Sequence, residues 1–289
     1  MNNIWSDNIQ GTNTLYLSRK LRFDDAFAER YAKAFGIDNA EKPKILELGC
    51  GPGALAESLH RWYKGADITA LDRDSGFIAF AKRNIAGVDF IEGDAERLPF
   101  GDGSFDVTIS NTVHEHIDPE AFWGEQFRVL KPGGICLCLS VRKGINCLAP
   151  CLKTTEEEEH FWKTADCDEN ELEKYGVGKF RTTEAELPKQ MEKFGFTKIS
   201  TAYAVIDLTP DDPKYPAKMA EAMIEAERQN DIEAIKSVHS NFDTEALKAV
   251  NRKYDERIRL YRAGQKQWDT AVTVTMIVRG VKRPICAEC

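Results

Sequence analysis

Three glycines on alternate positions, Gly49, Gly51 and Gly53, form the stretch of this chain whose spacing most directly suggests chemistry. The apolar run before them, 45–48, is typical of a buried strand, and helical spacing resumes at Ala54. Glycine lacks a Cβ, so the backbone can adopt positive φ and a flat ligand can lie against the peptide plane. Free N–H groups at the start of a helix also favour an anionic or hydrogen-bond-accepting group. The stretch therefore predicts a ligand-binding turn between a strand and a helix.

Two carboxylates near this turn bear on the kind of ligand. The turn fits the Gly-x-Gly-x-x-Gly/Ala pattern of nicotinamide enzymes when it is aligned on Gly49, Gly51 and Ala54. Glu47, however, would repel a pyrophosphate and would suit a cationic ligand. Asp72 ends the next strand-like segment, where a carboxylate can hold a ribose diol. A nicotinamide-dependent oxidoreductase is kept as the alternative that leaves Glu47 unexplained.

Five segments in a fixed order extend this pattern. They are Glu47–Gly53, Leu71–Asp72, Gly93–Phe100, Phe105–Asn111 and Leu130–Gly134. In order and spacing they resemble the class I S-adenosylmethionine-dependent methyltransferases over residues 44 to about 140. The segment 94–100 is most similar to the UbiE-like branch, which acts on quinone precursors, sterols and other small metabolites. The resemblance concerns the cofactor half, so it does not identify an acceptor.

The resemblance implies a set of cofactor-binding residues. Glu47 and the glycines would surround the amino-acid part of S-adenosyl-L-methionine, Asp72 would hold the ribose, and Asp94 with Ala95 would border the adenine. Tyr16 and Arg19 are candidates for the cofactor's carboxylate, as is Tyr31, with simple packing or solvated charge as the alternative. The full set is Tyr16, Arg19, Glu47, Gly49, Cys50, Gly51, Gly53, Asp72, Arg73, Asp94, Ala95, Glu96 and Asn111.

Three residues after the strand 105–110 are the catalytic candidates: Asn111, His114 and His116. In the family this strand end faces the methyl group and the acceptor. Methyl transfer from a sulfonium is an in-line displacement that chiefly requires positioning. A base is needed only if the nucleophile must lose a proton, and His114 or His116 could provide it. Either histidine could instead cap a helix or pack in the core.

Composition and charge argue against some classes of function. The 289 residues carry a net charge of −8 and no basic stripe, which argues against a nucleic-acid partner. No run approaches the ~20 apolar residues of a membrane span, and we expect a cytoplasmic protein. The eight cysteines are expected to be reduced thiols. Cys147, Cys151 and Cys167 could form a soft-metal site, although ordinary thiols are the simpler interpretation and no metal is predicted.

The expected architecture is an α/β fold: a Rossmann-like, doubly wound, seven-stranded and mostly parallel sheet. Residues 1–43 form an N-terminal helical cap segment, and 44–289 the methyltransferase domain. In the first segment, apolar residues recur at mostly helical spacing and Gly36 is the expected stop; they are Leu21, Phe23, Phe27, Tyr31 and Phe35. A strand is expected over 135–141, and Thr183 with Glu186 is expected to form the capping box of a helix that ends at Gly195. Inserts at about 142–182 and 209–268 would form a lid or cap. The strand order 3-2-1-4-5-7-6 is implied by the resemblance. The four glutamates 156–159 are expected on a solvated helix face.

A helical stripe in the second insert needs a partner surface. It consists of Leu247, Val250, Tyr254, Ile258 and Tyr261, at spacings of three and four. It could cap the active site or pair with another subunit as a homodimer.

The predicted function is methyl transfer from S-adenosyl-L-methionine to a small-molecule acceptor. A non-catalytic protein that retains the cofactor pocket remains a second alternative, because no acceptor-side residue is diagnostic.

Overall fold

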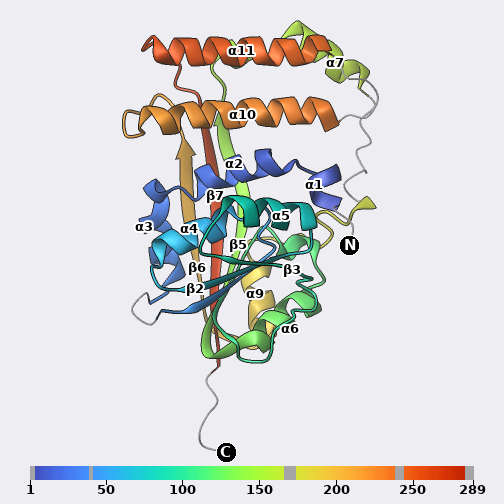
Figure 1. Cartoon of the computed structure of the whole chain (residues 1–289), viewed down its shortest axis with the longest axis vertical. Coiled ribbons are helices and arrows are strands. Elements are labelled where there is room, and N and C mark those ends of the chain that lie inside the picture. Colours follow the sequence, from blue (N-terminus) through green and yellow to red (C-terminus); the bar gives the residue numbers. More distant parts are fainter. Residues whose placement is uncertain (1–3, 39–41, 166–173, 238–243, 284–289) are drawn as a thin grey trace, which may run out of the picture.

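The computed structural model describes residues 4–38, 42–165, 174–237 and 244–283. Seven strands form one sheet in the order β3-β2-β1-β4-β5-β7-β6, which confirms the predicted order (Figure 1). Neighbouring strands from β3 through β5 are parallel, and β7 is antiparallel to both β5 and β6. The strands are β1 (Lys44–Leu48), β2 (Asp67–Asp72), β3 (Asp89–Glu92), β4 (Phe105–Asn111), β5 (Leu130–Cys147), β6 (Phe196–Leu208) and β7 (Thr270–Lys282).

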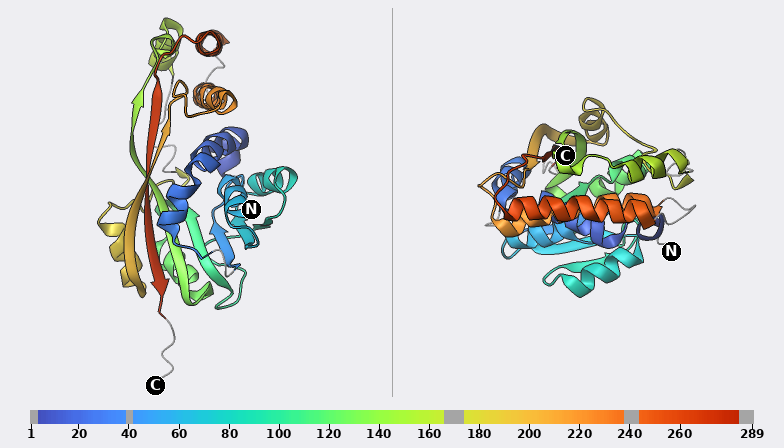
Figure 2. Two further views of the ribbon diagram at one scale, coloured as in Figure 1. Left: turned by 90° about the vertical axis from the view of Figure 1, so that its left-hand side faces the viewer. Right: turned by 90° about the horizontal axis from the view of Figure 1, so that it is seen from above.

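Helices cover both faces of the sheet (Figure 2). One face packs against α3 (Ala28–Phe35), α4 (Ala54–Trp62) and α5 (Ser75–Asn84), and the other against α6 (Pro119–Val129) and α9 (Glu186–Lys193). The predicted capping box at the start of α9 is present, because Thr183 and Glu186 exchange backbone-to-side-chain hydrogen bonds. Two apolar layers therefore hold the central strands in place.

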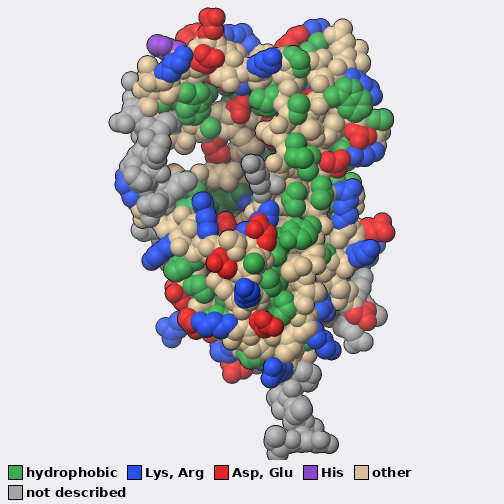
Figure 3. Space-filling model, turned by 180° about the vertical axis from the view of Figure 1, so that it is seen from behind, with side chains coloured by type: hydrophobic (Ala, Val, Ile, Leu, Met, Phe, Trp, Pro, Cys, Tyr) green, Lys and Arg blue, Asp and Glu red, His purple; other side chains and the backbone are tan. Residues whose placement is uncertain are grey.

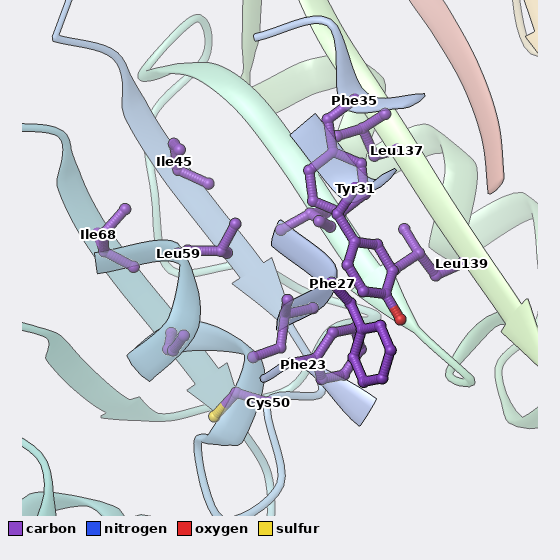
Figure 4. Close-up of a cluster of buried hydrophobic side chains, with 14 of the residues drawn as sticks. Phe23, Phe27, Tyr31, Phe35, Ile45, Cys50, Leu59, Ile68, Leu137 and Leu139 are labelled. Carbon is purple, nitrogen blue, oxygen red and sulfur yellow. The ribbon is translucent and has the colours of Figure 1, made fainter. Parts of the chain in front are cut away.

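The N-terminal segment supplies a large part of the first layer. It contains α1 (Ile4–Asn8), α2 (Thr12–Arg22), the 3₁₀ turn η1 (Asp25–Phe27) and α3. Its predicted inward residues Leu21, Phe23, Phe27, Tyr31 and Phe35 are all buried, and the last four lie close together beside β5 in Figure 4. The predicted stop at Gly36 is confirmed, because Gly36 closes α3 with φ +57°.

The strand expected over 135–141 is much longer in the structure. β5 continues to Cys147, and β7 stays paired with it to the register Cys147↔Thr270. β6 accompanies β7 as far as Leu208↔Ala271. β5, β6 and β7 thus extend beyond the other four strands of the sheet, and Figure 2 shows them running the length of the molecule.

A second, smaller core lies on this extension; we call it the cap. It comprises the turn η4 (Pro150–Leu152), α7 (Glu156–Thr164), α10 (Ala217–Ser237) and α11 (Thr244–Arg262). The helical stripe of α11 packs inside the cap with Phe161, Ile224 and Leu152, so these residues find their partners within the chain. Figure 1 shows α10 and α11 stacked above α2.

The glutamate run does not behave as a uniform solvated face. Glu158 is 4% exposed and lies 2.6 Å from the Lys253 ammonium, which is also 3.1 Å from Asp231. Its side chain also completes the capping box of α7 with Thr155. The sequence-based prediction was wrong for this residue because α7 packs against α11.

The outer face of the strand extension carries exposed apolar residues, among them Ile145, Tyr203 and Val205. Figure 3 shows hydrophobic side chains in a run over this face. Among the described residues, no helix combines the length and apolar character that crossing a membrane requires.

Candidate active site

A cavity lies where the loops after β1, β2, β3 and β4 meet, and it holds about 1000 Å³ of atom-free space, part of it open to solvent. This is the position expected for a ligand of an open parallel sheet. Every predicted cofactor residue lines it except Gly53 and Tyr16. The α2 helix closes one side with Leu15 and Arg19, and α1 adds Trp5.

The glycine turn has the strained geometry that only glycine takes easily. Gly49, Gly51 and Gly53 have φ of +62°, +55° and +89°. A Cβ on Gly49 would lie 2.4 Å from Cγ2 of Val113, a residue of the cavity wall. A Cβ on Gly53 would meet Phe90 at 2.8 Å. Gly53 is thus required for packing and for starting α4, and it is not among the residues that line the cavity.

Asp72 organises the turn from the end of β2. One of its oxygens accepts a hydrogen bond from the Gly51 amide at 2.7 Å, and the other accepts one from Asp74 at 2.9 Å. Burial raises the pKa of Asp72, and these two bonds oppose the rise. The carboxylate is therefore fixed at the cavity wall where the sequence predicts a ribose partner.

Glu47 is 2% exposed, and its Oε2 has no hydrogen-bond partner in the described part of the chain. Burial raises the pKa of this carboxyl well above its usual range, and the charge on Asp72 raises it further. Glu47 and Asp72 thus line one cavity and lie close enough for the charge of one to act on the other. This arrangement favours a ligand that brings positive charge.

Arg19 reaches the same cavity from α2. Its Nη2 donates to Thr112 Oγ1 at 3.1 Å, while Nη1 is buried and unpartnered among the described residues. Burial lowers the pKa of Arg19 to about 9, with Arg22 adding to the shift, so the guanidinium is still charged at neutral pH. An unsatisfied guanidinium nitrogen can hold a ligand carboxylate.

Tyr16 is placed differently from its sequence-based prediction. Its hydroxyl donates to Glu57 on α4 at 2.8 Å and accepts from Lys20 at 3.1 Å. Its ring packs edge-on to Phe80. Tyr31 is also outside the cavity, where its hydroxyl donates to the Arg22 carbonyl. Both residues dock the N-terminal helices and do not face the ligand space.

The segment after β3 forms a tight turn at the cavity wall. Asp94 accepts a hydrogen bond from the Glu96 amide at 2.9 Å and pairs in an isolated bridge with Arg97. Asp94, Ala95 and Glu96 all line the cavity, as does Arg73 from the neighbouring loop. The geometry brings these residues together with Asp72.

The two histidines of η3 (His114–His116) have opposite placements. His116 lines the cavity, and its Nδ1 accepts a hydrogen bond from the Gly178 amide at 2.8 Å. The neutral ring therefore carries its proton on Nε2, which lies 3.5 Å from Glu115 Oε1. Burial, with Arg181 second, lowers the pKa of His116 to about 4. His116 is accordingly a neutral hydrogen-bond donor at pH 7.

His114 lies outside the cavity and is 3% exposed. Its Nε2 is 3.1 Å from Thr182 Oγ1. Burial, followed by the charge of Arg142, lowers its pKa to about 4. Of the three catalytic candidates, the structure therefore brings Asn111 and His116 to the cavity and places His114 behind its wall.

Two features of the site were missed by the sequence analysis. Trp5 stacks edge-on against His116, with ring centroids 4.9 Å apart. Asp74 caps α5 and also accepts hydrogen bonds from the amide and hydroxyl of Ser6, both at 2.9 Å. The N-cap pattern marks Asp74 as a helix start, but no local signal indicates that it would anchor a helix 68 residues away.

The three Cys candidates do not come together in the described residues. Cys147 is exposed, Cys151 is partly buried, and Cys167 lies outside the described residues.

Comparison with known proteins assigns the part of the chain that supplies most of the cavity wall. Residues 46–138 match the family model described as a methyltransferase domain. These residues form a methyltransferase domain. The match runs from β1 into β5 and confirms the resemblance drawn from the five sequence segments.

Curated relatives share the methyltransferase domain but are matched over part of their length. A fatty-acid O-methyltransferase of Mycolicibacterium smegmatis is 42% identical over 108 residues, which are 36% of this chain and 39% of that protein. The ubiquinone/menaquinone biosynthesis C-methyltransferase UbiE of Desulfotalea psychrophila is 37% identical over 99 residues, or 33% of this chain and 40% of that protein. The chain thus spans about two-fifths of the length of these curated relatives.

A solved structure supports the fold over nearly the whole chain. Haemonchus contortus phosphoethanolamine N-methyltransferase 2, crystallised in complex with S-adenosyl-L-methionine, superposes with a TM-score of 0.53 and 19% identity. The match covers 97% of this chain and 60% of that chain. It supports a Rossmann-like fold for this chain.

Proposed function

We propose that this protein transfers a methyl group from S-adenosyl-L-methionine to a small-molecule acceptor. The methyltransferase domain supports the reaction class. The names of the relatives, which act on a fatty acid and on quinone precursors, support a small acceptor.

The observation that carries the proposal is the buried Glu47 beside the glycine turn, whose Oε2 has no hydrogen-bond partner among the described residues. S-adenosyl-L-methionine brings a sulfonium and an ammonium, which would supply the missing positive charge. Its carboxylate fits the free Nη1 of Arg19, and its ribose diol fits Asp72. NAD would bring a pyrophosphate to two carboxylates instead, so the charge of the cavity disfavours it.

In this proposal, the residues that face the acceptor hold it in position and do not act as a base. Once bound, the cofactor supplies an electrophilic methyl group. His116 offers a neutral donor from Nε2, and its other nitrogen is engaged by Gly178. With pKa values of about 4 for both histidines, neither is a strong base at neutral pH. We infer that the acceptor reacts through an atom that needs no proton removed by the protein, such as a carboxylate or a neutral amine.

Thermal unfolding with separate additions of S-adenosyl-L-methionine, S-adenosylhomocysteine and NAD tests the cofactor assignment. A ligand at about 100 times its Kd adds ~2.7 kcal/mol, enough to raise the Tm by several degrees. Both adenosyl ligands should stabilise the protein and NAD should not. A shift with NAD alone would establish the oxidoreductase alternative instead.

A second assay separates an enzyme from a cofactor-binding protein. S-adenosylhomocysteine formation is followed across a panel of carboxylates, amines and phenols. We expect turnover with carboxylates or amines ahead of phenols. Tight cofactor binding with no product from any acceptor would favour the non-catalytic alternative.

A further inference from the structure

A second cavity lies in the cap, and α2 contributes Ser18, Leu21 and Arg22 to its wall. Its walls come from α2, α10, α11, η4 and the outer ends of β5, β6 and β7. It holds about 690 Å³ of atom-free space, part of it open to solvent. Nothing in the methyl-transfer proposal uses this space.

Apolar side chains make up much of the wall. Leu21, Leu152, Leu208, Met223 and Ile224 face the cavity from four different elements. Four of them, Leu21, Leu152, Met223 and Ile224, are 2–7% exposed, so this part of the wall is buried. A wall of this kind fits an aliphatic chain.

Arg22, a cation on this wall, has no hydrogen-bond or ion-pair partner for its side chain among the described residues. It lies three residues after Arg19 on α2 and is partly buried. A buried charge is costly unless it is paired. Guanidinium groups pair in fork geometry with carboxylates and phosphates.

Glu227 bears on the charge that a ligand paired with Arg22 can carry. It lines the same cavity and lies near enough to Arg22 to affect its pKa, yet it makes no ion pair with it. Burial and the charge of Asp231 raise the pKa of Glu227. With a second acid present, a single negative charge fits the site better than the two charges of a phosphate.

We propose that this cavity binds an amphipathic monocarboxylate, with its carboxylate on Arg22 and its aliphatic chain along Leu21, Leu152 and Met223. Ser18 and Asn230, which also line the cavity, can donate further hydrogen bonds to the carboxylate. The proposal does not depend on methyl transfer, because it concerns binding alone.

Calorimetric titration of octanoate, 1-octanol and octylamine into the full chain tests it. All three carry the same chain, so they differ only in the head group. Octanoate should bind one site, octanol at least about tenfold more weakly because it lacks the charge-assisted bonds, and octylamine more weakly still. Equal affinity for octanoate and octanol, or no binding of octanoate, would overturn the proposal.

Variants locate the site. Arg22→Gln should weaken octanoate at least about tenfold and leave S-adenosylhomocysteine affinity unchanged, because Arg22 does not line the cofactor cavity. The matched control is Arg83→Gln, at an exposed arginine on α5 whose guanidinium donates to the Ala79 carbonyl of the same helix. Glu227→Gln should bind octanoate at least as tightly as the original protein. An equal loss of octanoate affinity in Glu227→Gln and in Arg22→Gln would show that Glu227 is the true partner of Arg22, against the proposal. The comparison of octanoate, octanol and octylamine needs no variant.

Discussion

The methyltransferase domain and the cap are held together by different kinds of interaction. In the domain, short local patterns place the chemistry: a glycine turn, a strand ending in an acid, and a turn after β3. In the cap, partners distant in sequence fix the structure. Arg257 is fully buried and bonds to Asp211 at 2.8 Å and to Asp269 at 2.6 Å.

This difference explains why the cofactor can be inferred from sequence and the acceptor cannot. In the function proposed above, the domain recognises the cofactor through backbone groups and a few acids near strand ends. The cap is built from ion pairs spanning up to 95 residues, such as Lys253 with Glu158, and these have no local signal. Altering each region should therefore affect different properties.

The largest effect is expected from Arg257→Ala. The change leaves Asp211 and Asp269 buried without their cation and should lower the free energy of unfolding by ~3–5 kcal/mol. Urea denaturation measures it. Arg259→Ala, on the same helix with an exposed ion pair to Glu256, should cost less than ~1 kcal/mol. If Arg257→Ala also weakens cofactor binding in the folded protein, the two regions are not separable.

Gly49→Ala should act on the domain. The φ of +62° costs an alanine ~1–2 kcal/mol, and the clash with Val113 adds to it. We expect S-adenosylhomocysteine affinity to fall about 100-fold in calorimetric titration. Gly124→Ala is the control, because a Cβ at this position in α6 meets nothing within 4 Å. It should raise the free energy of unfolding by ~0.5–1 kcal/mol, and loss of cofactor affinity there would point to a general disturbance.

The histidines of η3 predict a pH dependence of stability. Their folded pKa values of about 4 lie below the ordinary 6.5, so the unfolded chain binds more protons between these values. Stability should be unaffected above pH 6.5 and fall by ~1–3 kcal/mol per histidine as the pH drops towards 4. His114→Gln should flatten the curve in urea titrations at pH 7, 6 and 5. An unchanged slope would mean that His114 is more solvated than its 3% exposure indicates.

Glu47 predicts that cofactor binding depends on pH. Burial raises its pKa in the free protein, and a bound cation would lower it, so binding releases a proton. Affinity for S-adenosyl-L-methionine should rise with pH until the free carboxyl is ionised. Glu47→Gln should remove this dependence and weaken binding about tenfold at pH 8. A pH profile that Glu47→Gln leaves intact would assign the proton to another group.

The smallest effect is expected from Tyr16→Phe. The hydroxyl contacts Glu57 and Lys20, outside the cavity, so cofactor affinity should change by less than about twofold. A change of tenfold or more would return Tyr16 to the cofactor site and show that α2 moves on binding.

Prediction from sequence was most successful where a residue's role depends on its immediate neighbours. The strand order, the stop at Gly36 and the capping box of Thr183 follow from such patterns. It was wrong for Glu158, whose burial depends on α11. It named both His114 and His116 as candidates, because the three residues of a 3₁₀ turn point in different directions and the sequence does not show which of them faces the cavity.

β5 pairs with β4 at one end and belongs to the cap at the other, 18 residues later. At ~3.3 Å per residue such a strand is ~60 Å long. Within the described residues, three paired strands therefore join the cap to the domain. Exchanging the cap for another would require strands that match in register, since a slip of one residue turns every inward side chain outward. Relatives with other caps should accordingly differ by even numbers of residues in β5, β6 and β7.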